Sequence, residues 1–522
     1  MSNLTARDLN SALWAAADEM RRVMSADVYK DYLLGLIFYK VLSDKMLVEA
    51  YDLLNDEKPE SLDAAQIAYT EALMDGSWED LSLELNNRFG CVIHPRRTFT
   101  AFYNQINART FMLSELRQAF RGIEAASGGT YEGLFEDFDI DSKDLGKTPG
   151  NRNEMISSVI KALAHIDFND YPEDALGDAY EYLIAQFASE SGKKAGEFYT
   201  PQSVSQIIAR IVTAGQNTKY GFTVYDPAMG SGSLLLQIRS QIRNDDAKGI
   251  NNKGAVHFFG QELKNQTYNL ARMNMMLHRV PGTNQHLRNG DTLDADWPTD
   301  EPTNFDAVVM NPPYSQKYDA RESLLTDPRF AAYKKLPPAS KADFAFLLHG
   351  FYHLKDSGTM GIVLPHGVLF RGGAEGMIRE TLLRNGNIYA VIGLPSGIFF
   401  STGIPTCIAV LKKNNTDRSV FFVDASKEFR KEGPRNYLDP EHIDKIVDAV
   451  LKRENVEKFA HLATFEEIQN NDFNLNIPRY VDNFEEEEQI DISATFANLA
   501  KLDRQETEVD LQLSKYFKEL GV

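Results

Sequence analysis

The chain has 522 residues, of which 43% are hydrophobic and 25% charged, a composition typical of a globular protein of two to four domains. It has no run of about 20 apolar residues and no basic segment followed by an apolar one at its start, so we predict neither a transmembrane helix nor a signal peptide. Its net charge of −20 argues against a protein that binds DNA by itself. It has only two cysteines, Cys91 and Cys407, and no C-x-x-C motif, so we predict no metal site. So few cysteines also indicate the reducing cytoplasm.

The first part of the chain, residues 1–165, is predicted to be an all-α domain. The stretches LNSALWAAADEMRRVM and YKDYLLGLIFYKVLSDKMLVEAYDLL repeat apolar residues at three- and four-residue spacing, which is typical of helices. Residues 127–153 are polar and contain several glycines, so we expect a loop or a loosely packed connector there.

The middle part, residues 166–440, is predicted to be an α/β domain. Short β-branched or aromatic runs alternate with helical segments, which predicts a mostly parallel sheet covered on both faces. Strands are expected at 222–226, 255–260, 305–310, 359–365, 388–395, 406–413 and 419–425, and helices at 233–243, 263–280 and 341–355.

The last part, residues 441–522, is predicted to be helical and charged. Beyond the charge run FEEEEQ, apolar residues recur at three- and four-residue spacing, interrupted by Glu506: Leu502, Val509, Leu513, Tyr516 and Leu520. This pattern is typical of a short coiled-coil-like helix that packs on a partner or on another domain.

A Gly-rich turn, in VYDPAMGSGSLLL, follows the first predicted strand. Asp226 ends that strand, and Gly230 and Gly232 let the backbone approach a ligand closely, at the strand ends where open α/β sheets bind ligands. Because the chain has neither G-x-G-x-x-G nor G-x-x-x-x-G-K-[ST], no phosphate cradle is predicted. Glu262 ends the second predicted strand, where a ribose hydroxyl would lie, and Asp291 adds a third carboxylate. This set predicts a cationic nucleoside ligand without phosphate, such as S-adenosylmethionine.

The strand FDAVVM runs directly into NPPY. Asn311 ends the strand, and its side-chain carbonyl can accept a hydrogen bond from an exocyclic amine. The rigid backbone of Pro312 and Pro313 can aim the Pro312 carbonyl as a second acceptor, and Tyr314 offers a ring on which an extruded base can stack. Two acceptors would localise the lone pair of an aromatic amine, so the motif predicts methyl transfer to an amino group without a strong base.

These motifs resemble those of the amino-methyltransferases, and NPPY favours N6 of adenine. The segment KAGEFYTPQSV at 194–204, followed by the Gly-rich turn and then NPPY, resembles the modification subunit of type I restriction–modification systems. Four further segments are similar to that family: KADFAFLLHGFYHLK, GIVLPHGVLFRGGAEGMIRETLL, GIFFSTGIPTCIAVLKK and FNLNIPRYVD. The resemblance covers about residues 1 to 480 and implies a Rossmann-like methyltransferase domain that methylates adenine in DNA with S-adenosylmethionine.

The resemblance also implies roles for individual residues. Cofactor contacts are expected from one segment before the Gly-rich turn, from the turn itself and from two acidic strand ends: Glu197, Phe198, Tyr199, Thr200, Pro201, Gln202, Asp226, Gly230, Ser231, Gly232, Ser233, Glu262 and Asp291. The target-base site is expected at Asn311, Pro312, Pro313 and Tyr314. His366 and Arg371 are expected to pack a loop at a strand end rather than to touch the substrate.

The family resemblance implies partners as well: DNA, a specificity subunit that reads the DNA sequence, a second modification subunit, and in some complexes a restriction subunit. Two other hypotheses stay open, a stand-alone enzyme that methylates DNA or a protein glutamine and a catalytically silent scaffold of a DNA-binding complex. The segment 317–335, directly after NPPY, clusters basic and aromatic residues. It is either a flap over a flipped base or an exposed loop.

Overall fold

The computed structural model describes residues 5–171, 175–191, 199–216, 219–242, 256–300, 302–399, 403–433, 435–483 and 492–520. The chain divides by its internal contacts into a large unit, Met1–Val481, and a small one, Asp482–Val522. The predicted division into 1–165, 166–440 and 441–522 stays a prediction.

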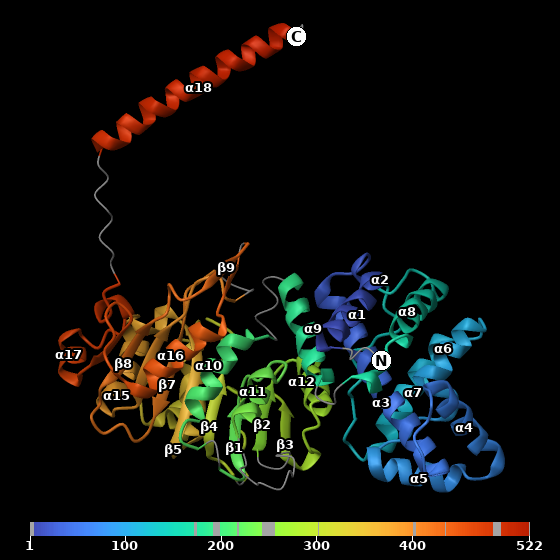
Figure 1. Cartoon of the computed structure of the whole chain (residues 1–522). Coiled ribbons are helices and arrows are strands. Elements are labelled where there is room, and N and C mark those ends of the chain that lie inside the picture. Colours follow the sequence, from blue (N-terminus) through green and yellow to red (C-terminus); the bar gives the residue numbers. More distant parts are fainter. Residues whose placement is uncertain are drawn as a thin grey trace. The chain divides into compact units, whose positions relative to one another are not determined.

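The N-terminal part of the large unit is helical (Figure 1). Its helices are α1 (Ala6–Ala16), α2 (Asp18–Arg21), α3 (Ala26–Asn55), α4 (Leu62–Asp75), α5 (Trp78–Phe89), α6 (Phe99–Asn107), α7 (Leu113–Ala126), α8 (Pro149–Ala164) and α9 (Ala175–Ser191). Helix α3 is the central one, because most of its side chains are buried on all sides rather than along one stripe. Helix α9 packs against α1 and α3 and also against α12 (Asn265–Leu277), so it joins this helical part to the rest of the unit.

The connector at 127–153 is well packed, and the expectation of loose packing was wrong. The ring of Phe135 stacks on that of Phe120, with centroids 4.1 Å apart and planes 2° from parallel. Phe138 meets Tyr32 edge to face at 5.0 Å. These aromatic side chains fill the helical core although the backbone around them forms turns instead of helix or strand.

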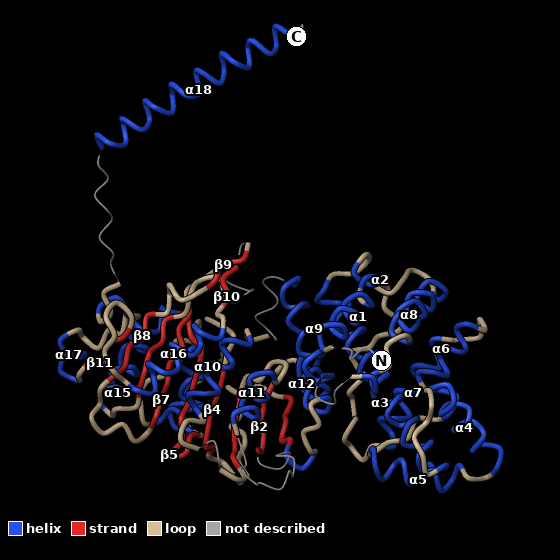
Figure 2. Tube along the Cα trace, viewed as in Figure 1, coloured by secondary structure: helices blue, strands red, loops and turns tan. Residues whose placement is uncertain are grey.

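A nine-stranded, mostly parallel sheet forms the rest of the large unit (Figure 2). Its order is β11-β8-β6-β7-β5-β4-β1-β2-β3, and only β7 and β11 run antiparallel to their neighbours. The strands are β1 (Phe222–Asp226), β2 (Val256–Glu262), β3 (Gln285–Asn289), β4 (Phe305–Met310), β5 (Leu354–Pro365), β6 (Ile388–Gly393), β7 (Thr406–Lys412), β8 (Val420–Asp424) and β11 (Ala460–Ala463). The predicted strands are confirmed, while β3, β11 and the small hairpin of β9 (Arg430–Glu432) and β10 (Arg435–Tyr437) were not predicted.

Helices cover both faces of the sheet, as expected for parallel strands. One buried apolar layer joins it to α10 (Gln202–Val212), α11 (Ser233–Gln241), α12 and α16 (Pro440–Lys452). The other joins it to α14 (Asp343–Tyr352), α15 (Gly373–Arg384) and α17 (Phe465–Asn470). From β1 the chain proceeds to β2 and β3 on one side and then returns to β4 on the other. This reversal creates a crevice at the carboxyl ends of β1 and β4, where such sheets bind ligands.

The small unit contains α18 (Ile492–Leu520). Large apolar side chains are exposed along its length: Phe496, Leu499, Leu502, Val509, Leu511, Leu513, Tyr516, Phe517 and Leu520. Among the described residues, no helix has the length and apolar character needed to cross a membrane.

Candidate active site

The Gly-rich turn lies where β1 meets α11. Gly232 caps the N-terminus of α11 with φ of +78°, and a Cβ atom there would lie 3.3 Å from Met275. A Cβ on Gly260 of β2 would lie only 2.3 Å from the sulfur of Met229 in the turn. Gly232 is favoured because its positive φ would strain any other residue, and Gly260 because a side chain there would collide with Met229 of the turn.

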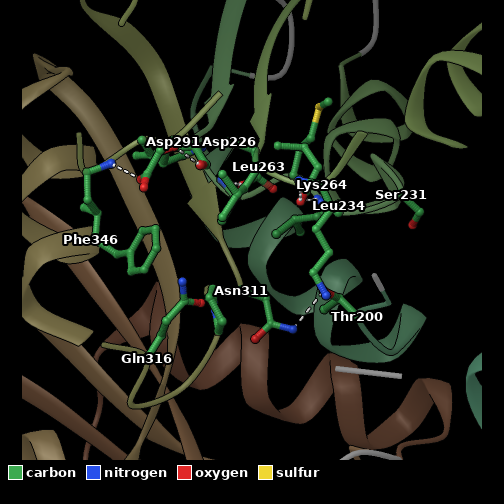
Figure 3. Close-up of a pocket in the computed structure, with 18 of the residues that line it drawn as sticks. Thr200, Asp226, Ser231, Leu234, Leu263, Lys264, Asp291, Asn311, Gln316 and Phe346 are labelled. Atoms are coloured by element: carbon green, nitrogen blue, oxygen red, sulfur yellow. Dashed lines mark hydrogen bonds between the residues drawn. The ribbon is translucent and has the colours of Figure 1, made fainter. Parts of the chain in front are cut away.

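Three carboxylates lie at or just after the ends of the adjacent strands β1, β2 and β3, and two of them, Asp226 and Asp291, are labelled in Figure 3. Asp226 accepts a hydrogen bond of 2.9 Å from the amide of Ala228, and burial raises the pKa of its carboxyl to about 8. Glu262 accepts from the amides of Gly230 at 3.2 Å and Lys264 at 2.8 Å, while burial raises its pKa. A buried carboxyl with so high a pKa is suited to bind a cation, which would stabilise its ionised form.

Asp291 follows β3 at the same edge. Its carboxylate accepts a hydrogen bond of 2.9 Å from the amide of Leu293. The next residue, Thr292, donates to the carbonyl of Pro227 at 2.5 Å, so the loop after β3 is tied to the Gly-rich turn after β1. The acidic strand ends are thus held together by backbone contacts of their own loops.

Asn311 directly follows β4, on the opposite side of the crevice. Its amide donates a hydrogen bond of 3.0 Å to the hydroxyl of Thr200, in the segment before α10. Its carbonyl accepts one of 2.7 Å from the hydroxyl of Tyr314. The half-buried ring of Tyr314 meets Phe399 edge to face at 6.2 Å. The two predicted motifs, one for the cofactor and one for the target, therefore meet at the side chain of Asn311.

Arg371 acts on this site through another residue. It pairs with Asp343 at 2.6 Å and with Glu375 at 2.5 Å, and the other oxygen of Asp343 accepts the amide of Ser315 at 2.7 Å. His366 contacts the carbonyl of Thr406 at 3.1 Å. Both contacts agree with the packing role predicted for the loop that contains His366 and Arg371.

Most of the predicted site residues line a single pocket: Tyr199, Thr200, Asp226, Gly230, Ser231, Ser233, Glu262, Asp291, Asn311 and Pro313. Its other walls include residues that sequence reasoning missed, among them Leu234, Leu263, Lys264, Thr292, Leu293, Gln316 and Phe346. Lys317 and Tyr318 also line it, and they belong to the segment predicted to be either a flap over the base or an exposed loop. No local signal identifies Phe346, since it belongs to an apolar helix and reaches the pocket only through the fold.

Four of the other predicted residues support the pocket without lining it. Pro201 caps α10, Gly232 caps α11, Pro312 is buried, and Tyr314 reaches the pocket through Asn311. Gln202, the first residue of α10, lines a neighbouring cavity together with Tyr199 and Thr200. Glu197 and Phe198 lie outside the described residues.

Comparison with known proteins places this geometry in a family. Residues 171–489 match the model of the N-6 DNA methylases, and residues 9–163 match the model of the HsdM N-terminal domain. The chain belongs to the N-6 DNA methylase family. In this methylase the α/β sheet lies within the first match, and most of the helical N-terminal part lies within the second.

The relatives are methylase subunits of type I restriction enzymes. The MpnII methylase subunit of Mycoplasma pneumoniae is 34% identical over 502 residues, covering 92% of this chain and 90% of the relative. The HindI methylase subunit of Haemophilus influenzae is 30% identical over 452 residues, covering 80% and 99%. The methylase is therefore an adenine-specific DNA methyltransferase of the type I modification class.

Solved structures agree. The type I restriction–modification methyltransferase subunit from Streptococcus thermophilus is 54% identical, with a TM-score of 0.87 over 92% of this methylase and 100% of that chain. This similarity confirms the predicted α/β methyltransferase fold with a helical N-terminal part.

Proposed function

We propose that this chain transfers a methyl group from S-adenosylmethionine to N6 of adenine in a specific DNA sequence, as the modification subunit of a type I restriction–modification complex, and so protects host DNA. One observation carries the proposal. Asn311, the acceptor needed for an exocyclic amine, opens onto the same pocket as Asp226, Glu262 and Asp291, the carboxylates suited to a cationic nucleoside.

The pocket fits the cofactor chemically. Burial raises the pKa of the Asp226 carboxyl to about 8, so a neighbouring cation would strongly favour its ionised form at neutral pH. Asp226 and the turn from Gly230 to Ser233 would hold the amino-acid end, Glu262 the ribose hydroxyls and Asp291 the adenine side. When bound, the cofactor supplies a methyl group on a sulfonium.

Asn311 and the Pro312 carbonyl would hold the target amine by accepting its two hydrogens. This pair of acceptors localises the nitrogen lone pair, which in free adenine is delocalised into the ring. In the present arrangement the Asn311 carbonyl is already occupied by the Tyr314 hydroxyl at 2.7 Å. Because a carbonyl oxygen has two lone pairs, the amine of the arriving base either shares this acceptor with the hydroxyl or displaces it, and the ring of Tyr314 is placed to stack on the base.

The partners follow from the same proposal. A specificity subunit would select the DNA sequence, two copies of this chain would accompany it, and a restriction subunit would join in a nuclease-competent complex in the cytoplasm. The exposed apolar side chains of α18 support a helical partner for the tail, because such a row is normally covered in an assembled protein.

Transfer of a labelled methyl group separates this function from its alternatives. Purified chain and labelled cofactor would be incubated with duplex DNA, with and without a specificity subunit, and with a protein extract as the alternative acceptor. Label in the adenine N6 position that depends on the specificity subunit supports the proposal. Label in protein glutamine would replace it, and absence of transfer with intact cofactor binding would indicate a scaffold.

A further inference from the structure

The segment 315–341, which directly follows the NPPY motif, is a closed loop. The amide of Tyr318 near its start donates a hydrogen bond of 3.0 Å to the carbonyl of Ala339 near its end. The amide of Ala342 donates one of 2.8 Å to the carbonyl of Gln316. The start and the end of the loop therefore lie side by side, and the loop returns to the rim of the pocket that its first residues line.

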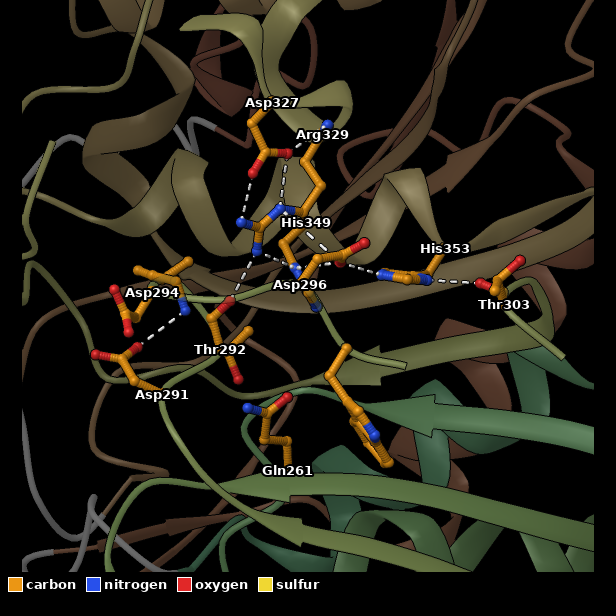
Figure 4. A network of polar contacts seen from close by, with 12 residues as sticks. Gln261, Asp291, Thr292, Asp294, Asp296, Thr303, Asp327, Arg329, His349 and His353 are labelled. Atoms are coloured by element: carbon orange, nitrogen blue, oxygen red, sulfur yellow. Dashed lines mark hydrogen bonds and ion pairs between the residues drawn. The ribbon is translucent and has the colours of Figure 1, made fainter. Parts of the chain in front are cut away.

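A buried arginine, Arg329, attaches this loop to the rest of the fold (Figure 4). Arg329, in the short helix α13 (Pro328–Ala331), has a side chain only 1% exposed and pairs with Asp327 at 2.7 Å. It also donates to the carbonyl of Thr292 at 2.9 Å and contacts Nδ1 of His349 in α14 at 3.1 Å. Since Thr292 lines the pocket, the loop is fixed to the cofactor side of the site as well as to the core.

The histidines beneath the loop are structural. A guanidinium can only donate, so Nδ1 of His349 accepts from Arg329 and Nε2 carries the hydrogen, 2.9 Å from the Tyr225 hydroxyl. Burial, with His353 and Arg329 nearby, lowers the pKa of His349 well below its usual value. His349 lies near enough to Asp296 and His353 to share a metal ion, but both of its nitrogens are already in use and a guanidinium adjoins the cluster.

The outer side of the loop is basic. Lys317, Lys334 and Lys335 are exposed, and within the described part of the chain no ion pair is found for any of them. Residues 315–341 contain six basic and three acidic residues, and two of the acidic ones are paired within the loop, Asp327 with Arg329 at 2.7 Å and Asp319 with Arg321 at 3.7 Å. A local excess of positive charge on a chain of net charge −20 indicates an anionic partner at this place.

We propose that Lys317, Lys334 and Lys335 contact phosphates of the DNA strand on either side of the target adenine. This inference rests on the proposed function, since a base that enters the pocket brings its flanking phosphates to the rim where Lys317 lies. The loop is already closed and anchored, so binding orders little additional backbone. The segment is then neither a mobile flap nor an exposed loop without a role, but a preformed binding surface for the DNA backbone.

The test compares two triple variants of the full chain assembled with its specificity subunit. K317Q/K334Q/K335Q removes the proposed contacts, and K58Q/K147Q/K458Q removes three exposed lysines elsewhere as a matched control. Each phosphate contact contributes about 0.9 to the slope of log affinity against log salt, so we expect the first variant to lose roughly 2–3 in slope. Its KM for DNA should rise at least ~10-fold at physiological salt. The double variant K334Q/K335Q, whose positions do not line the pocket, should lose part of the slope and keep its affinity for the cofactor.

The outcomes are distinct. A salt slope and DNA affinity equal to those of the control variant would overturn the inference while leaving the function intact, provided that the unaltered complex methylates DNA. If the unaltered complex transfers no methyl group to DNA, the proposed function itself fails. Loss of cofactor affinity in K334Q/K335Q would also contradict the inference, because it assigns these two exposed lysines to DNA alone.

Discussion

The hydroxyl of Tyr314 lies 2.7 Å from the side-chain carbonyl of Asn311 and donates a hydrogen bond to it. Burial raises the pKa of Tyr314, so the hydroxyl stays protonated and remains a donor. With the Asn311 amide donating to Thr200, both ends of this side chain are satisfied before any base arrives. The base therefore competes with an internal donor for the acceptor on which the proposed chemistry depends.

We expect Asn311→Ala to reduce methyl transfer by at least ~10³-fold, because the variant lacks an acceptor for the amine. Cofactor affinity should change by less than about fivefold, since the lost contact to Thr200 is a single neutral hydrogen bond of ~1 kcal/mol or less. Calorimetry of cofactor binding beside a transfer assay checks both, with Thr200→Val as the control for that contact. Transfer at the unaltered rate would rule out the assigned role.

Tyr314→Phe and Tyr314→Ala should behave differently. The phenylalanine variant keeps the ring and removes the competing hydroxyl, so transfer should be retained and the KM for DNA should not rise. The alanine variant loses the stacking surface, worth ~1–3 kcal/mol per base, so DNA binding should weaken by roughly 5- to 150-fold. Equal loss of activity in both variants would show that the hydroxyl itself is needed.

The pKa of Asp226, about 8, predicts a pH dependence of cofactor binding. Below this pH the carboxyl is protonated, and a bound cation favours the ionised form, so affinity should rise by up to ~10-fold per pH unit and level off above it. Calorimetry between about pH 6 and 9 would measure this, and Asp226→Asn should bind weakly at every pH. A pH-independent affinity in the unaltered protein would contradict the assignment of Asp226.

The carboxyl of Asp226 also makes the stability of the cofactor-free protein depend on pH, but here a higher pH lowers stability. In the unfolded chain the carboxyl ionises near pH ~4, whereas in the fold it keeps its proton to about pH 8. The folded state thus binds more protons over this range, so the free energy of unfolding contributed by Asp226 falls as the pH rises. Thermal unfolding of the cofactor-free protein at several pH values would measure this, and the Asp226→Asn variant should lack the loss of stability with rising pH. The same loss in the variant would show that another group causes it.

Removal of residues from about 485 onward should leave a folded protein that binds the cofactor and assembles poorly. The site lies wholly within Met1–Val481, while the exposed apolar side chains of α18 lie beyond it. Size-exclusion chromatography with the specificity subunit checks this, and replacing Leu502, Val509 and Leu513 by serine in the full chain should have the same effect. Unchanged complex formation by the truncated chain would exclude the tail as the partner-binding element.

The isolated chain should bind DNA weakly and without sequence preference. Its net charge of −20 disfavours binding to DNA, which is a polyanion. Contacts from Lys317, Lys334 and Lys335 alone are too few to supply both the affinity and the few kcal/mol needed to flip a base. A gel-shift titration at physiological salt, repeated with the specificity subunit, checks this. Nanomolar, sequence-specific binding by the chain alone would show that it reads the DNA itself.

The strands that could be predicted are those with continuous apolar runs. The strand β4 is buried at every position, so its composition is unambiguous. Edge strand β3, with the sequence QHLRN, is half-buried and polar, and β11 has only four residues, so neither carries a recognisable pattern. The burial of the aromatic rings in 127–153 could not be predicted, because these residues lie in turns, whose sequence has no periodicity that indicates a buried face.

The site residues that could be predicted are those at the carboxyl ends of the predicted strands. Asp226, Glu262 and Asn311 come directly at or after β1, β2 and β4, and the carboxyl ends of parallel strands meet at one edge. The hydrogen bond between Tyr314 and Asn311 could not be predicted, because it depends on the turn that two prolines make. Nor could the burial of Arg329, since a basic residue in a polar segment normally lies in solvent.

The exposure of α18 makes this helix an indicator of assembly. All of its side chains that the structure describes, from residue 495 to 520, are exposed, so little besides its own backbone hydrogen bonds opposes fraying. In a free chain its amides should exchange with solvent rapidly, and proteases should cut there first. A chain made in excess of its partner would thus be shortened to the unit ending near Val481, which keeps the pocket and, by the truncation prediction above, should assemble poorly. The ratio of full-length to shortened chain in a cell would then record how closely the synthesis of the two subunits is matched.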